Sequence, residues 1–290
     1  MNHSENPLRV AFQGERGAFS EEAAVKLLGE SIQTVPRATF EALFSAIREG
    51  AADAALAPIE NSLAGSVYRS YDLLLESRLQ VAGEVILPIA HNLIGIRGAV
   101  FAGIEIVESH PVALAQCEHF FQQHPHLKRV ATLDTAGSVR QVVEANDPKR
   151  AAIAGSRAAR IHGGQILLEH IEDHRENYTR FLLLFADSRT DAHADKLSLV
   201  VQLSHTPGAL NCALGSFASR RINLLKIESR PIPGHPWEYR FYLDLESSLS
   251  DQSTREALDE LRRCAREVTV LGCYPSDKSS SGPSNPKEEA

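Results

Sequence analysis

The sequence lacks several features that would place it in a specialised class of protein. Lys and Arg number 30 against 37 Asp and Glu, a net charge of -7, so no basic excess is available for a nucleic-acid or anionic-membrane surface. No apolar run is long enough to span a bilayer. The first residues show no basic stretch followed by an apolar one, so no secretory signal is recognisable, and we expect a cytoplasmic protein.

Cysteine is also sparse, and its spacing excludes the usual cysteine-based sites. The four cysteines are Cys117, Cys212, Cys264 and Cys273, and no pair has the CxxC spacing of a zinc site or a redox motif. In a cytoplasmic protein such scattered cysteines are normally thiols. We therefore predict four reduced cysteines and no metal site.

The remaining composition is that of an ordinary globular protein, with 43% hydrophobic and 23% charged residues over a length that suggests two domains. In the first part of the chain, short apolar runs alternate with amphipathic stretches, which is typical of a mostly parallel sheet with helical crossovers. The sequence predicts strands over 8–12, 32–35 and 54–58, and helices ending near 28, 48 and 76, the first two capped by Ser20 and Thr39.

A strand-like stretch over 79–96 crosses a boundary near 88–91, and a second alternation begins there. Two similar lobes joined by crossing strands leave a cleft between them, lined by loops at the strand ends. The second alternation predicts strands over 105–108, 128–132, 151–154 and 181–185, and helices over 112–123, 134–145 (capped by Asp134) and 157–162.

The pattern of elements changes after a polar stretch at 187–195, which we interpret as a linker. The order strand, helix, strand, strand, helix, strand over 197–272 is the ferredoxin-like βαββαβ pattern. The last segment, 276–290, is rich in Ser, Pro, Lys and Glu, and is predicted to be disordered.

The segment 177–181 (NYTRF) leads into the apolar run of a buried strand. An amide, a hydroxyl and a guanidinium at the start of this strand can donate several hydrogen bonds but supply no base, thiol or metal ligand. Such a group suits an anionic substrate whose leaving group is an oxygen. Taken alone, the segment favours a plain strand start with an exposed Arg180, and its glycosylation sequon matters only in a secreted chain.

Other polar segments also stand at element ends, and each has an ordinary structural interpretation beside a functional one. The loop 14–20 precedes a helix whose N-terminus attracts carboxylate or phosphate, but it is otherwise a turn. Segments 60–62, 109–110 and 116–117 fit either a cleft wall or local caps. In the C-terminal part, 207–210 opens a helix and 228–231 ends a strand; together they suit a free amino acid, and separately a turn and an ion pair.

Taken together and in this order, these segments resemble prephenate dehydratase with a C-terminal ACT regulatory domain. The resemblance covers about residues 8–275, and the segments NYTRF and ESRP carry most of its weight. Ala18, Val112 and the pair Gly137-Ser138 depart from the family's usual residues. The similar segments are 14–20 (GERGAFS), 58–62 (PIENS), 87–91 (LPIAH), 109–111 (SHP) with 116–117 (QC), 134–136 (DTA), 177–181, 207–210 (PGAL), 222–224 (INL), 227–231 (IESRP) and 271–275 (LGCYP).

The resemblance implies a two-lobed, periplasmic-binding-protein-like (type II) α/β catalytic domain over 8–186 and a ferredoxin-like ACT domain over 197–275. The lobes would be 8–90 with 177–186, and 91–176. It also implies a monofunctional enzyme that needs no cofactor and converts prephenate to phenylpyruvate, carbon dioxide and water. Phenylalanine would inhibit a homodimer or homotetramer through the ACT domain.

The resemblance also assigns site residues. Thr179 would act on the leaving hydroxyl. Substrate contacts are expected from Ser20, Glu60, Asn61, Ser62, Ser109, Gln116, Arg180 and Phe181. Phenylalanine contacts are expected from Gly208, Ala209, Leu210, Asn223, Glu228, Ser229 and Arg230.

Two other functions fit the same sequence. Segments 69–75 and 83–88 are similar to plant members that prefer arogenate, which carries an amino group in place of the keto group, and Leu183 does not separate the two specificities. A non-catalytic amino-acid sensor would also use a two-lobed cleft and an ACT domain. The intact segments 60–62 and 179–181 argue against this sensor.

Overall fold

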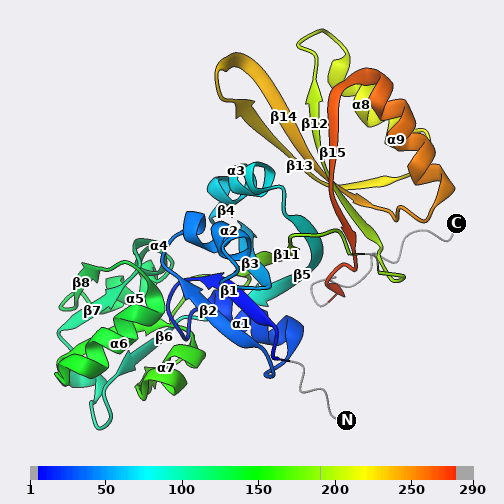
Figure 1. The fold of residues 1–290 in the computed structure, drawn as a ribbon. Coiled ribbons are helices and arrows are strands. Elements are labelled where there is room, and N and C mark those ends of the chain that lie inside the picture. The colour runs from blue at the N-terminus through cyan, green and yellow to red at the C-terminus, as the bar shows by residue number, and fades with distance from the viewer. Residues whose placement is uncertain (1–5, 190, 279–290) are drawn as a thin grey trace, which may run out of the picture. The chain divides into compact units, whose positions relative to one another are not determined.

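The computed structural model describes residues 6–189 and 191–278 (Figure 1). The chain forms two compact units, Met1–Ser77 with Val85–Leu182, and Arg78–Glu84 with Leu183–Ala290. Two strands, β5 (Gln80–Pro88) and β11 (Tyr178–Phe185), extend across the division between the units. In the described ranges, no helix combines the length and the apolar character needed to cross a membrane.

The first lobe of the first unit is built on the sheet β2-β1-β3-β11-β5, with the short β4 beside β3. Strand β1 runs parallel to both β2 and β3, as the alternating pattern predicted. The first six residues of β3 are buried because this central strand is covered on both faces. Its elements are β1 (Arg9–Gln13), α1 (Phe19–Leu28), β2 (Gln33–Arg37), α2 (Phe40–Arg48), β3 (Ala54–Asn61), β4 (Gly65–Ser66) and α3 (Tyr68–Ser77).

The second lobe has its own sheet in the order β10-β6-β9-β7-β8. Strand β7 is parallel to β8 and β9, whereas β6 is antiparallel to β9 and β10. Strand β10 was not predicted. The elements are β6 (Asn92–Gly95), a 3-10 turn η1 (Phe101–Gly103), β7 (Ile106–Ser109), α4 (Pro111–Ala115), α5 (Glu118–Gln123), β8 (Lys128–Ala131), α6 (Thr135–Ala145), β9 (Arg150–Ala154), α7 (Ser156–His162) and β10 (Gln165–Leu168).

Two of the predicted helix caps are confirmed and one is wrong. Thr39 accepts a hydrogen bond from the Ala42 N–H, and Asp134 accepts one from the Gly137 N–H, so both cap as expected. Ser20 is not a cap: Ala18 occupies the N-cap position of α1 without a side-chain bond, and Ser20 is buried in the first turn.

The single helix expected over 112–123 is instead two helices, interrupted at Gln116. The carboxylate of Asp173 accepts hydrogen bonds from the N–H groups of Glu118 and His119 at 2.9 Å each and so caps a new helix start. The Asp173 N–H in turn donates to the Gln116 carbonyl. Because Asp173 lies far along the chain, local pattern gave no sign of this break.

The two lobes of the first unit are joined by packing and by ion pairs. Phe12 and Ala18 of the first lobe share a hydrophobic cluster with residues of α6, β9 and α7. Arg140 on α6 binds Glu15 through two bonds of 2.7 and 2.9 Å. The fully buried Glu21 on α1 meets Arg157 on α7 at 3.3 Å. The loop 14–20 is therefore held against the second lobe.

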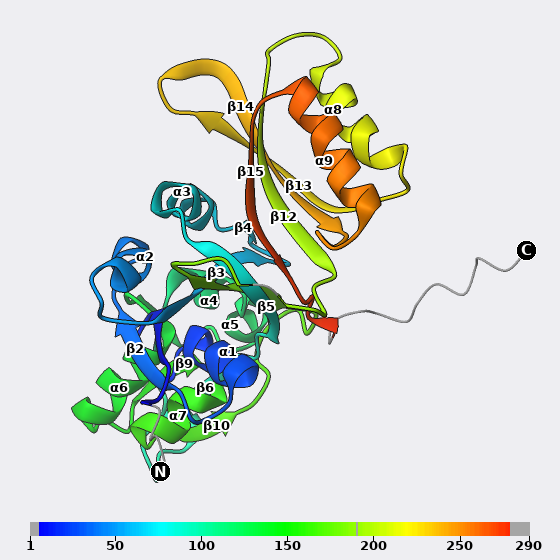
Figure 2. The same ribbon diagram turned by 45° about the vertical axis from the view of Figure 1, so that its right-hand side comes forward.

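The C-terminal unit has the predicted βαββαβ order. Its antiparallel sheet follows the order β13-β14-β12-β15. Helices α8 and α9 lie side by side on one face of it, as both views show (Figures 1 and 2). The elements are β12 (Lys196–Leu203), α8 (Ala209–Ala218), β13 (Asn223–Ile232), β14 (His235–Glu246), α9 (Gln252–Cys264) and β15 (Ala265–Tyr274).

Two sequence expectations for this unit need correction. Cys212 on α8 and Cys264 on α9 form a disulfide, so the prediction of four reduced cysteines is wrong for this pair, while Cys117 and Cys273 are free. Sequence spacing missed the pair because 52 positions separate two cysteines that adjacent helices bring together. Ser276 is held by two hydrogen bonds to Asp195, contrary to the predicted disorder from 276, and 279–290 lie outside the described residues.

Candidate functional site

The first unit contains a cleft of about 420 Å³ lined by residues of both lobes. The first lobe supplies the loop after β1, the end of β3 and the start of β11. The second lobe supplies the segments where α4 and α6 begin. Five residues expected at the substrate site line this cleft: Ser20, Asn61, Gln116, Thr179 and Phe181.

The other four expected substrate residues do not line the cleft. Ser109 is fully buried, and its hydroxyl donates to the Ile153 carbonyl at 2.6 Å. Ser62 is exposed, and its hydroxyl donates to the Glu176 carbonyl at 3.0 Å. Arg180 lies between the lining residues Thr179 and Phe181 on β11, and because successive strand side chains point to opposite faces, it faces away. Glu60, next to Asn61 at the end of β3, is not among the lining residues.

A chain of side-chain hydrogen bonds runs along the cleft wall and starts from the backbone. The Asn61 Oδ1 accepts from the N–H groups of Leu63 and Ala64, which assigns Nδ2 as its donor atom. That Nδ2 lies 2.7 Å from Asn177 Oδ1, 2.9 Å from Thr179 Oγ1 and 3.1 Å from the Tyr178 carbonyl. The Thr179 oxygen thus accepts a hydrogen bond, and its own hydrogen is left to donate into the cleft.

The chain continues into the second lobe through residues that sequence analysis undervalued. Asn177, which is fully buried, donates through Nδ2 to Gln116 Oε1 at 3.0 Å. The same oxygen lies 2.9 Å from Nε2 of His91. Asn177 was part of the NYTRF segment and His91 part of the LPIAH segment, and the sequence assigned neither residue a role of its own.

Cationic side chains are absent from the cleft wall as far as the described residues show it. The titratable groups that line it are His91, His110 and Asp134. His110 and Asp134 are engaged as N-caps of α4 and α6. Burial lowers the pKa of His91 below its ordinary value and outweighs the opposing effects of Gln116 and Glu172. An anion here would meet hydrogen-bond donors and the N-terminus of α1, where backbone N–H groups favour negative charge.

The chemistry of this wall is that of hydrogen bonding and proton transfer. Over 6–189 and 191–278, no group of three His, Cys, Asp or Glu side chains is arranged to hold a metal ion. Cys117 is buried, and burial raises the pKa of its thiol, so it is no nucleophile near neutral pH.

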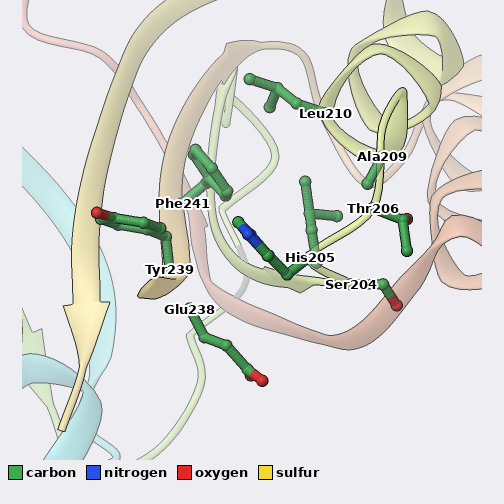
Figure 3. Close-up of a pocket in the computed structure, with 9 residues that line it drawn as sticks. Ser204, His205, Thr206, Ala209, Leu210, Glu238, Tyr239 and Phe241 are labelled. Atoms are coloured by element: carbon green, nitrogen blue, oxygen red, sulfur yellow. The ribbon is translucent and has the colours of Figure 1, made fainter. Parts of the chain in front are cut away.

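The C-terminal unit has a smaller pocket of about 150 Å³ (Figure 3). Of the seven residues expected to bind phenylalanine, Ala209 and Leu210 line it. Gly208 is the N-cap of α8, at a positive φ of 84°. The other four, Asn223, Glu228, Ser229 and Arg230, lie on β13 and not in the pocket. Residues that the sequence did not indicate complete the wall: Leu203, Ser204, His205, Thr206, Glu238, Tyr239 and Phe241.

A two-lobed α/β cleft whose described wall has no cationic side chain, followed by a ferredoxin-like unit, is the architecture of a small-molecule-binding protein with an appended regulatory-type domain. The family model for prephenate dehydratase matches residues 10–189. The chain belongs to the prephenate dehydratase family, as its segments predicted, and it is an enzyme of the prephenate dehydratase type.

Two similar proteins have names that agree with this assignment, and a third is described as an acylase. Arogenate dehydratase/prephenate dehydratase 2, chloroplastic, of Arabidopsis thaliana is 42% identical over 93% of this chain and 73% of its own length. A prephenate dehydratase from Arthrobacter aurescens solved with L-Phe has a TM-score of 0.83 at 33% identity, covering 92% of this chain and 90% of its own. A structure described as GqqA, a novel type of quorum quenching acylase, has a TM-score of 0.85 at 32% identity over 93% and 98%.

Proposed function

We propose that this enzyme converts prephenate to phenylpyruvate, carbon dioxide and water. The observation that carries the proposal is the hydroxyl of Thr179, which lines the cleft and is turned by Asn61 into a hydrogen-bond donor. As the ring hydroxyl departs, negative charge develops on its oxygen, and a preorganised donor stabilises that transition state more than the ground state. Aromatisation of the ring drives the loss of the carboxylate as carbon dioxide.

The cleft wall also favours breaking the second bond, the one between the ring and its carboxylate. Its apolar members, including Phe19, Ile89 and Phe181, leave a carboxylate poorly solvated. A poorly solvated carboxylate fragments to neutral carbon dioxide more easily, because the charge leaves the low-dielectric site. The test is to incubate the purified protein with prephenate and to follow phenylpyruvate by its absorbance; no phenylpyruvate above the rate without enzyme would contradict the proposal.

Arogenate is the second candidate substrate, because the Arabidopsis relative is named for both activities. The two substrates share the ring, its hydroxyl and its carboxylate, so the cleft can perform the same chemistry on either. Steady-state kinetics on both substrates with one enzyme preparation, compared as kcat/KM, decide which is preferred.

We also propose that phenylalanine binds the C-terminal unit and inhibits the enzyme. The Arthrobacter aurescens relative was solved with L-Phe. The pocket has apolar walls from Leu203 and Phe241 and hydroxyls from Ser204 and Thr206, which suit a side chain and a carboxylate respectively. Glu238 points away from Phe241 and His205 in Figure 3 and binds Arg266 at 2.8 Å. Millimolar phenylalanine should lower activity and raise the melting temperature; no change in either would contradict this.

A homodimer or homotetramer is the assembly that we propose. The C-terminal unit exposes Leu225, Ile227, Trp237 and Tyr239, large apolar side chains that a monomer leaves in water. Strand β13, which carries the first two, is an edge of its sheet and can pair with a second copy. Light scattering on the purified chain measures the mass directly, and a strictly monomeric protein at micromolar concentration would contradict the proposal.

The GqqA structure is described as an acylase, and this chain supports an acylase activity less well than it supports the dehydratase reaction. A serine or cysteine acylase needs its nucleophile within hydrogen-bond reach of a base. None of the described histidines hydrogen-bonds a Ser, Thr or Cys side chain, and Ser109 is occupied by a backbone carbonyl. Hydrolysis of an N-acyl homoserine lactone, measured beside prephenate turnover, tests this alternative. The cytoplasmic location stays a prediction from the sequence.

A further inference from the structure

His91 has one ring nitrogen that no described residue satisfies. The side chain is 2% exposed, lies in the cleft wall and packs edge-on against the ring of Phe19. Its Nε2 meets Gln116, but its Nδ1 is buried without a hydrogen-bond partner among the described residues. An unpaired buried polar atom costs about 1–3 kcal/mol, so one that a native protein keeps at a cleft wall is a candidate to meet a ligand.

The hydrogen-bond chain decides which nitrogen carries the proton. Two backbone N–H groups orient Asn61, Asn61 orients Asn177, and Asn177 donates to Gln116 Oε1. An oxygen that already accepts from Asn177 also accepts from His91, so the neutral imidazole is protonated on Nε2. Nδ1 is then a bare lone pair, and any further proton that the ring takes up must enter there.

The electrostatics of the cleft favour protonation of His91 at Nδ1 when substrate is bound. Empty, the site holds His91 neutral, because burial lowers its pKa. Prephenate brings two carboxylates to a wall whose described residues include no Lys or Arg. The carboxylate of Glu172 accepts from the His91 backbone N–H at 2.7 Å, and its charge favours a cationic ring. Asp134 and His110 are the other ionisable groups that line the cleft. Opposite charge nearby raises a histidine pKa.

We propose that Nδ1 of His91 takes up a proton as the substrate anion binds and gives it to the departing ring hydroxyl. This inference rests on the proposed dehydratase function. As the ring carbon–oxygen bond breaks, its electron pair goes to oxygen, which accepts the proton and leaves as water. The bond between the ring and its carboxylate breaks at the same time, carbon dioxide leaves, and that electron pair completes the aromatic ring. His91 is then neutral again and takes its next proton from solvent when another substrate anion binds.

The proposal supplies what Thr179 lacks. A threonine hydroxyl stabilises a departing oxygen by hydrogen bonding, but it is far too weak an acid to protonate it alone. General acid catalysis by a positioned side chain contributes typically about 10²- to 10⁴-fold. His91 is therefore a catalytic residue in this scheme, and Gln116 and Asn177 are positioning residues that set its tautomer.

The decisive variant is His91→Gln. A glutamine amide can reach the position of Nε2 and keep a donor to Gln116, but it has no atom at the position of Nδ1 and no proton to give near neutral pH. We expect kcat to fall about a hundredfold or more with a similar circular dichroism spectrum and melting temperature. His124→Gln is the matched control, because this ring packs on Phe101 and Phe120 and does not line the cleft, and it should retain kcat within about threefold.

A pH profile separates proton donation from a structural role. The kcat/KM of the wild type reports the free enzyme, so it should fall as pH rises through the lowered pKa of His91, and this limb should vanish in His91→Gln. An active wild type whose kcat/KM is flat from about pH 5 to about pH 8 would overturn the inference, even if the variant does not fold. So would a His91→Gln variant within about threefold of wild-type kcat. A wild type inactive on prephenate and arogenate would instead contradict the proposed function itself.

Discussion

Asn61 and Thr179 are 118 positions apart in sequence, yet the Asn61 amide nitrogen lies 2.9 Å from the Thr179 hydroxyl oxygen. The pair joins the end of β3 to the start of β11, two neighbouring strands of one sheet. Asn61 is itself held by the backbone N–H groups of Leu63 and Ala64. The donor direction of the proposed catalytic hydroxyl is thus set by the backbone turn after β3.

Removing the Thr179 hydroxyl should abolish most activity and leave the fold intact. In Thr179→Ala, we expect kcat to fall about 10²- to 10³-fold, because losing one transition-state donor costs about 2.7–4 kcal/mol. Thr179→Ser keeps the hydroxyl and should retain kcat within about tenfold. Steady-state assays of phenylpyruvate formation, with melting curves for both variants, test this. An alanine variant as active as the serine variant would refute the role.

Asn61→Asp should impair the enzyme although Thr179 is untouched. The substitution replaces the amide donor by a carboxylate oxygen opposite three acceptors, Asn177 Oδ1, the Tyr178 carbonyl and Thr179 Oγ1. The Thr179 hydroxyl then donates to the new carboxylate and no longer to the substrate. We expect kcat to fall about a hundredfold. Asn223→Asp, in the C-terminal unit, is the control; equal effects of the two substitutions on kcat would contradict the mechanism.

The buried pair of Glu21 and Arg157 should make the free energy of unfolding depend on pH in the acid range. Burial alone would raise the pKa of Glu21, but hydrogen bonds from the Gly17 N–H, Thr34 and Arg157 together lower it. A lowered carboxyl pKa contributes stability that is complete above the unfolded value near 4.5 and is lost as pH falls through the folded value. We expect Glu21→Gln to cost about 3–5 kcal/mol at neutral pH and to flatten this acid limb.

Urea unfolding at neutral pH and at about pH 4 measures both effects. Glu144→Gln is the matched control, because Glu144 pairs with Arg140 at 3.0 Å on the surface with 62% of its side chain exposed. Surface pairs of this kind contribute little, so its stability should stay within about 0.5 kcal/mol of wild type. A steep acid limb that persists in Glu21→Gln would show that other carboxylates control it.

Comparing Gly17→Ala with Gly29→Ala distinguishes the cost of backbone strain from the cost of steric crowding between the lobes. Both have a positive φ, 90° and 85°, so alanine is strained at either position by about 1–3 kcal/mol. At Gly17 a Cβ would lie 2.7 Å from the Ala158 Cα, whereas at Gly29 nothing lies within 4 Å. We expect Gly17→Ala to lose clearly more stability and also activity, because the loop 14–20 is pushed from α7. Equal melting temperatures for the two variants would contradict this.

The disulfide between Cys212 and Cys264 should stabilise the C-terminal unit. Closing a loop over 52 positions removes chain entropy from the unfolded state worth about 4 kcal/mol in the loop-entropy description. We expect a reductant, or Cys212→Ser, to lower the melting temperature of this unit, and Cys273→Ser to have little effect because Cys273 is free. Thiol titration of the unfolded protein without reductant tests for the disulfide, because a bridged pair leaves only Cys117 and Cys273 as free thiols. Four free thiols would show that the disulfide does not form.

The sequence pattern correctly predicted those structural elements that are determined by residues close together in the chain. The caps at Thr39 and Asp134 follow from a side chain three residues before the N–H that it binds. The C-terminal order of strands and helices follows from the period of apolar residues. The helix break at Gln116 was missed because its cause, the Asp173 carboxylate, is 55 positions from Glu118.

By itself, the sequence determined the family, the βαββαβ order of the C-terminal unit and the candidate status of Thr179. These depend on residue identity and on the spacing of near neighbours. Tertiary structure alone decided that the Ser109 hydroxyl binds a backbone carbonyl, that Cys212 pairs with Cys264, and that Nδ1 of His91 is buried without a hydrogen-bond partner among the described residues. Each of these outcomes requires two distant segments to meet, and the geometry of that meeting depends on how the whole chain packs.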